Sequence, residues 1–159
     1  GGMKCKKKKM LLSAALLILA AAAGPLTTHA EDATVTIADP YLNKVIYNSL
    51  GKTEDTPITK EEMLSITELS SDSLPYVDSP AEDLKEHNRG IVSLEGLQYA
   101  ENLVSLDLSE NRICDLSPLS ELKNLTYLEL DRNNIRDLSP LSGLSSLEHL
   151  NIYNNFWRT

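Results

Sequence analysis

A 22-residue unit occurs twice without a gap, at residues 103–124 and 125–146, and a third copy begins at Leu147. The two full copies are identical at 12 of 22 positions, mainly the Leu, Ile, Asn and Pro residues that shape a backbone. The pattern L-x-x-L-x-L-x-x-N-x-I at a fixed period is typical of a leucine-rich-repeat solenoid. We therefore expect an α/β solenoid fold: a short array of parallel strands whose convex side is 3₁₀ or irregular.

Each unit should begin with a strand that has one buried face, because apolar and polar residues alternate along L-x-x-L-x-L. The expected inward positions are Leu106, Leu108, Leu128, Leu130, Leu150 and Ile152. Ser-Pro pairs at 117–118 and 139–140 then predict short 3₁₀-like turns, since Pro fits the first turn of a helix. Residues 91–102 fit the same register as a degenerate first unit, so the repeats are placed at 91–159.

Asn111, Asn133 and Asn155 follow the strands at one register, where the chain must turn away from the sheet. An Asn side chain offers both donors and acceptors. It can therefore bond to backbone groups that such a turn would leave unpaired. These three residues are predicted to form a structural Asn ladder.

Residues 31–90 read as a helical cap over the open apolar end that a first repeat would otherwise expose. Asp39-Pro40 is an N-cap signal followed by Pro at the first helical position, and Gly51 closes the apolar run behind it. A second helix is predicted from the capping-box spacing of Thr59 and Glu62, with Met63, Leu64 and Ile66 as its apolar side. Residues 70–89 are rich in Ser, Asp and Pro and are expected to form a loop insertion, either loosely ordered or functional.

The first 30 residues have the three parts of a secretory signal peptide: basic residues, an apolar run from Met10 to Ala23, and small residues up to Ala30. Cleavage is expected after Ala30, with Ala23 as second choice. A membrane anchor is the alternative. A membrane span needs about 20 apolar residues, however, and the run from Met10 to Ala23 has 14. Gly1 and Gly2 precede Met3 and look like a cloning remnant.

Removal of residues 1–30 would leave ten Lys or Arg against 23 Asp or Glu, a formal charge of −13. Such an acidic surface repels phosphate, so nucleic-acid binding is not expected. Cys5 would leave with the signal, so Cys114 is expected to have no partner in the mature chain. His87 with scattered carboxylates is a weak metal signal, and no cofactor or metal site is predicted. No motif for hydrolysis or phosphate binding is found, so the chain is not expected to be an enzyme.

The acidic cap with Asp-Pro and a helix ending in Leu-Gly-Lys, followed by units reading N-x-I-x-D-L-S-P-L, closely resembles the internalin-type leucine-rich-repeat proteins of Gram-positive bacteria. The resemblance covers nearly all of residues 35–155. It implies a secreted or cell-surface protein that binds or adheres to a host or cell-envelope protein through the concave face. Two departures from the family are the 70–89 insertion and an array of only about two and a half units.

The outward strand positions define the candidate binding surface on the concave face. They are Ser105, Asp107, Ser109, Tyr127, Glu129, Asp131, His149, Asn151 and Tyr153, flanked by Arg132. Aromatic residues and Arg are enriched at interface hot spots. The alternative is that these are ordinary surface strand residues. Three strands give a face on the order of 250 Å², less than the roughly 800 Å² per partner of a stable interface.

The last unit breaks off at Phe156-Trp157-Arg158-Thr159, so we expect the array to continue beyond Thr159. The alternative is that Phe156 and Trp157 cover the open end. Surface attachment would then lie downstream of this chain. The rival functions are a targeting arm of a larger surface enzyme and a structural protein that self-associates through its uncapped end.

Overall fold

The computed structural model describes residues 33–75 and 90–155. The predicted signal peptide, most of the 70–89 insertion, and the Phe156-Trp157 end lie outside these residues. In the described part, no helix is both long and apolar enough to cross a bilayer.

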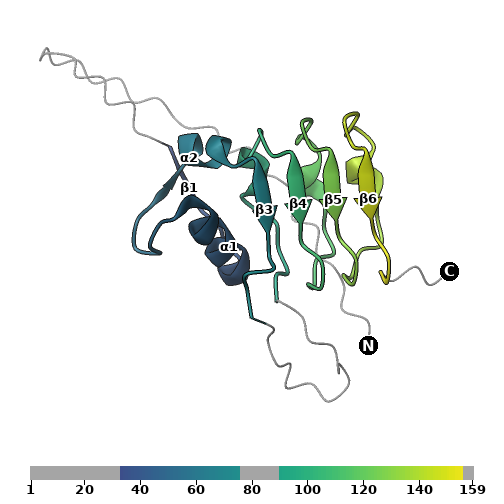
Figure 1. The fold of residues 1–159 in the computed structure, drawn as a ribbon, viewed down its shortest axis with the longest axis horizontal. Coiled ribbons are helices and arrows are strands. Elements are labelled where there is room, and N and C mark those ends of the chain that lie inside the picture. Colours follow the sequence, from purple (N-terminus) through teal and green to yellow (C-terminus); the bar gives the residue numbers. More distant parts are fainter. Residues whose placement is uncertain (1–32, 76–89, 156–159) are drawn as a thin grey trace, which may run out of the picture.

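A four-stranded parallel sheet runs through the repeats in the order β3-β4-β5-β6 (Figure 1). The strands are β3 (Glu68–Ser70), β4 (Ser105–Asp107), β5 (Tyr127–Glu129) and β6 (His149–Asn151). On the opposite side of each unit lies a 3₁₀ turn: η1 (Leu97–Tyr99), η2 (Ser117–Leu119) and η3 (Ser139–Leu141). The predicted solenoid of parallel strands with a 3₁₀ convex side is confirmed.

Strand β3 is the part of the sheet that sequence reasoning missed. Leu69 pairs with Leu106 at an interval of 37 residues, whereas Leu106 and Leu128 are only 22 apart. The first unit is therefore the same repeat with 15 additional residues behind its strand. Glu68–Ser70 had been placed in the N-terminal segment, but it pairs with β4 as the first strand of the repeat sheet.

The inward positions of the repeats form one continuous core. Leu106, Leu108, Leu128 and Leu130 are fully buried, as the strand alternation predicts. Leu150 occupies the same register but is 40% exposed, because β6 is the outermost strand of the described sheet. Burial of each repeat thus depends on the repeat that follows it.

Two helices precede β3 and lie on its side of the sheet (Figure 1). Helix α1 spans Pro40–Leu50 and ends at Gly51 in the left-handed conformation. Helix α2 spans Lys60–Ser65 and begins with the reciprocal capping box of Thr59 and Glu62. In α2, Met63 is buried but Leu64 is 39% exposed, so Leu64 does not belong to the apolar side predicted for it. Strands β1 (Thr34–Val35) and β2 (Ile58–Thr59) pair antiparallel beside the helices.

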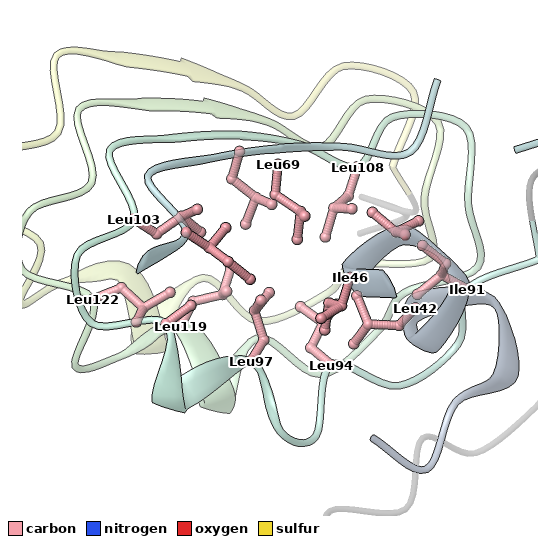
Figure 2. Packing of buried hydrophobic residues seen from close by; sticks show 14 of the residues in the cluster. Leu42, Ile46, Leu69, Ile91, Leu94, Leu97, Leu103, Leu108, Leu119 and Leu122 are labelled. Atoms are coloured by element: carbon pink, nitrogen blue, oxygen red, sulfur yellow. The ribbon is translucent and has the colours of Figure 1, made fainter. Parts of the chain in front are cut away.

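Helix α1 joins its apolar face to the core of the first repeat. Leu42 and Ile46 are fully buried and lie in the same cross-section as Ile91 and Leu94 (Figure 2). The carboxylate of Asp39 fixes this docking. Its Oδ1 accepts hydrogen bonds from the N–H groups of Tyr41 and Leu42 at the helix start. Its Oδ2 accepts hydrogen bonds from the N–H groups of Val92, at 2.8 Å, and Ser93, at 3.0 Å.

The three ladder Asn residues bond to backbone groups of the neighbouring repeats. Each Oδ1 accepts the N–H of the residue 20 positions earlier: Ile91, Ile113 and Ile135, at 2.9 to 3.0 Å. The Nδ2 of Asn133 and of Asn155 donates to the carbonyl of the residue 25 positions earlier. For Asn111 this place is taken by the hydroxyl of Ser71, at 3.0 Å, next to β3.

Cys114 is disulfide-bonded. The expectation of an unpaired thiol concerns the chain after removal of residues 1–30 with Cys5, and for that form it stays a prediction.

Candidate binding surface

The outward side chains of the sheet form rows that cross all four strands, because the strands pair in register. We call this surface the outer sheet face. Its first row is Glu68, Ser105, Tyr127 and His149, and its second row is Ser70, Asp107, Glu129 and Asn151. All of the predicted binding residues are exposed or partly exposed. The structure adds Glu68 and Ser70 to them, since β3 was not predicted.

Tyr127, Glu129 and His149 form a cluster in the centre of the β5–β6 half of this face. The rings of Tyr127 and His149 are stacked, with centroids 4.3 Å apart and planes 9° from parallel. Both rings contact the same carboxylate oxygen: the Tyr127 hydroxyl donates to Glu129 Oε1 at 2.8 Å, and His149 Nε2 lies 2.8 Å from it. This arrangement holds the two rings in one orientation although both are exposed.

The environment of the cluster shifts two pKa values in opposite directions. Burial alone would raise the pKa of Glu129, but hydrogen bonds from Tyr127, His149 and Asn151 outweigh it and hold that pKa below its ordinary value. The hydrogen bond to Glu129 raises the pKa of Tyr127, and partial burial adds to this. Glu129 is therefore ionised at neutral pH and Tyr127 is neutral, so the cluster keeps a negative charge beside its aromatic surface.

A third row follows the ends of the strands and contains Ser109, Asp131 and Tyr153. Tyr153 is 72% exposed, the highest value among the large hydrophobic side chains of the described residues. Tyr127 and Tyr153 thus give the outer sheet face two accessible aromatic side chains, and both come from outward repeat positions.

Arg132 is tied to the neighbouring repeat by an ion pair with Glu110, at 2.6 Å. Both residues have positive φ, 53° and 58°, at the turn just before a ladder Asn. The sequence predicts Arg132 as a flanking residue of the binding surface. In the structure its charge is already matched by a carboxylate one repeat away, although its side chain is 57% exposed.

An open groove of about 470 Å³ lies where helix α1 meets the outer sheet face. One wall comes from Asn48 and Ser49 of α1, and Tyr127 lies at the other side. The sheet between them contributes Glu68, Ser105 and Asp107. Sequence reasoning missed this groove, because nothing in the repeat period indicates that α1 borders the face of the sheet.

No group of three or more His, Cys, Asp or Glu is placed to hold a metal ion within residues 33–75 and 90–155. His149 has Glu129 as its partner, and His87 lies outside the described residues. The side chains that the structure brings together are suited to hydrogen bonding, stacking and ion pairing with a partner.

Comparison with known proteins supports the same type of fold. Residues 123–159 match a family model described as leucine-rich repeats (2 copies). No curated protein sequence matches the chain at a significant level. Among solved structures, an internalin (inlF) from Listeria monocytogenes is 32% identical with a TM-score of 0.61, and the match covers 74% of this chain and 30% of that one.

A second similar structure is the functional domain of InlJ from the same organism, 25% identical with a TM-score of 0.60. This match covers 74% of the present chain and 22% of the InlJ chain. The chain thus spans less than a third of either structure.

Proposed function

Since the chain is an internalin-type leucine-rich-repeat protein, we propose that it is a secreted or cell-surface protein that binds a host or cell-envelope protein through its outer sheet face. The observation that carries this proposal is the stacked pair of Tyr127 and His149 on a shared carboxylate. A fixed and exposed aromatic pair loses little conformational entropy when a partner covers it, which is a property of interface hot spots.

Secretion is proposed from the first 30 residues, whose basic, apolar and small-residue parts follow the order of a signal peptide. The acidic composition fits a protein that remains soluble outside the cell. Attachment to the cell surface belongs to the same proposal.

The outer sheet face is too small to form a stable protein interface by itself. Four strands give an area on the order of 330 Å², still below the roughly 800 Å² per partner of a stable interface. A partner must therefore also contact neighbouring surface. The groove beside α1 is contiguous with the sheet and offers part of that area.

The test is a binding screen against individually displayed extracellular domains of host proteins and envelope proteins of Gram-positive bacteria. Each interaction found is measured again with Tyr127→Ala/Tyr153→Ala, which we expect to weaken binding at least about tenfold, since hot-spot aromatics contribute about 2 kcal/mol or more. The matched control is Tyr99→Ala, which changes a partly exposed Tyr on the opposite side of the repeats. Binding that survives the double variant but is lost with Tyr99→Ala would place the interface elsewhere.

A second candidate function is self-association through the β6 end of the sheet. Leu150 is 40% exposed, whereas its counterparts Leu106 and Leu128 are fully buried. An apolar core position left open in this way can pair with another repeat. Light scattering at increasing concentration should then show dimers, and Leu150→Lys should reduce them. A monomer at all concentrations would exclude this candidate.

A further inference from the structure

We propose that the groove between α1 and the outer sheet face receives a basic side chain, best fitted by arginine, from a protein partner. This rests on the proposed binding function and names the chemistry that the partner must present. Three features of the groove support it: its size, its charge and the ring at its edge.

The groove has the size of a ligand cleft and not of a packing defect. Its volume of about 470 Å³ falls within the range of about 300–1,000 Å³ for such clefts. Its floor is closed by the buried side chains of Val45 and Leu69, so the first repeat and α1 hold its shape. A long side chain can therefore enter it without rearrangement of the core.

The charged side chains among the described residues that line the groove are all negative. Glu68 and Asp107 lie on adjacent strands, and no Lys or Arg is among the described residues that line the groove. Asp107 accepts only the N–H and hydroxyl of Ser109, at 3.0 and 2.7 Å, so its second oxygen has no bond that the structure records. Two neighbouring carboxylates without a cation favour a positively charged occupant.

Two carboxylates elsewhere in the described chain show the contrast. Glu62 is bonded to Lys52 at 2.7 Å, and Glu110 to Arg132 at 2.6 Å. In both places the chain provides its own basic side chain. In the groove it provides Ser and Asn side chains instead, which can accept hydrogen bonds from a guanidinium group.

The ring of Tyr127 lies at the edge of the groove and is held by Glu129 and His149. A planar guanidinium can stack on an aromatic face while its N–H groups reach carboxylates, which an ammonium group does less well. The same ring belongs to the outer sheet face. A single arginine could therefore join the groove to the remainder of the interface.

The experiment is an NMR titration of the ¹⁵N-labelled full chain with N-acetyl-arginine amide. We expect saturable amide shifts at Ser70, Ser105, Asp107 and Tyr127, weakened by added salt because the carboxylates are near the surface. N-acetyl-citrulline amide has nearly the same shape without the charge. It should bind about tenfold more weakly, as expected when ion pairs to an exposed and a partly exposed carboxylate are lost.

Glu68→Gln/Asp107→Asn should weaken arginine binding by a similar factor, since it removes both charges and keeps the size of each side chain. Its matched control is Glu101→Gln/Glu148→Gln, which removes two exposed carboxylates outside the groove and should leave binding unchanged. Unaltered amide shifts elsewhere in each variant would show that it folds.

Equal shifts with arginine and citrulline, or no saturable shifts at all, would overturn the proposal. So would binding of a neutral trisaccharide such as maltotriose at the same residues with no loss in the double variant, because the groove would then be a sugar site. The arginine titration and the partner screen test different proposals and can fail independently. A partner whose binding depends on Tyr127 and Tyr153 but not on Glu68 and Asp107 would leave the proposed function intact and exclude the arginine site.

Discussion

The Oδ1 atom of Asn133 accepts the backbone N–H of Ile113 at 2.9 Å, a bond between two buried residues that belong to successive repeats. The Nδ2 atom of the same side chain donates to three carbonyls, among them that of Leu108 in the preceding repeat, at 2.9 Å. One amide thus satisfies backbone groups on both sides of a repeat boundary.

Asn133→Ala should therefore destabilise the protein strongly, because it leaves the buried Ile113 N–H unpaired. Each buried polar group that loses its partner costs about 1–3 kcal/mol, which corresponds to a fall in melting temperature of roughly 5–10 °C. Asn155→Ala is the matched control: its side chain makes the same bonds but is only partly buried, so water can replace them. Thermal unfolding followed by circular dichroism measures both, and equal losses would contradict the role of burial.

Asp39 is expected to contribute more to stability than an ordinary helix cap. Asp39→Ala removes the cap of α1, worth about 1 kcal/mol, and also two bonds to Val92 and Ser93. The total loss in the free energy of unfolding should be about 2–4 kcal/mol. Thr59→Ala, which removes the cap of α2 alone, should lose about 1 kcal/mol. Urea denaturation distinguishes the two, and a loss for Asp39→Ala no larger than that of Thr59→Ala would argue against the docking role.

Gly96 and Gly143 should respond oppositely to the same substitution. Gly96 has φ 101°, and an added Cβ would collide with the side chain of Ile37. Gly96→Ala should cost about 2 kcal/mol or more. At Gly143 φ is not positive, and the nearest atom to an added Cβ is the mobile end of Lys123. Gly143→Ala should be neutral or stabilise by up to about 1 kcal/mol. Chemical denaturation measures the free energy of unfolding of both variants. A loss for Gly143→Ala as large as that for Gly96→Ala would contradict the prediction.

The ion pair between Lys52 and Glu62 should make stability depend on pH below neutrality. The hydrogen bond from Lys52, followed by that from the Thr59 N–H, lowers the pKa of Glu62 below 4.5. The folded protein therefore binds this proton less readily than the unfolded chain. The contribution is fully present above the unfolded pKa and is lost as pH falls through the folded pKa.

Glu62→Gln should consequently reduce the difference between the unfolding free energies at pH 7 and pH 3. Glu61→Gln, at the exposed neighbouring position, is the control and should preserve that difference. An unchanged pH profile in Glu62→Gln would mean that solvent screens the pair in solution.

The strands β4 to β6 and the 3₁₀ turns could be predicted because one 22-residue period repeats their core positions. Strand β3 could not, because 15 additional residues interrupt the period between Leu69 and Leu106. The start and end of α1 were readable from Asp39-Pro40 and Gly51. The exposure of Leu64 was not, since α2 is too short for its apolar residues to define one face.

The candidate site was only partly predictable for a similar reason. The repeat register places Tyr127 beside His149, 22 residues later, so their proximity follows from the sequence alone. That both rings contact Glu129 depends on side-chain rotamers. That α1 borders the sheet at β3 and forms a groove with it depends on the docking of a non-repeating segment. Neither has a periodic signal.

The bonds of Asp39 to Val92 and Ser93 have a consequence for the order of folding. They join residues 53 and 54 positions apart, whereas the Oδ1 bonds of the Asn ladder join residues 20 apart. Closing the longer loop costs about 0.9 kcal/mol more in chain entropy. The ribosome also completes α1 well before it adds Val92. Helix α1 must therefore remain undocked while the first repeat is synthesised, and its apolar face becomes covered only when that repeat has formed.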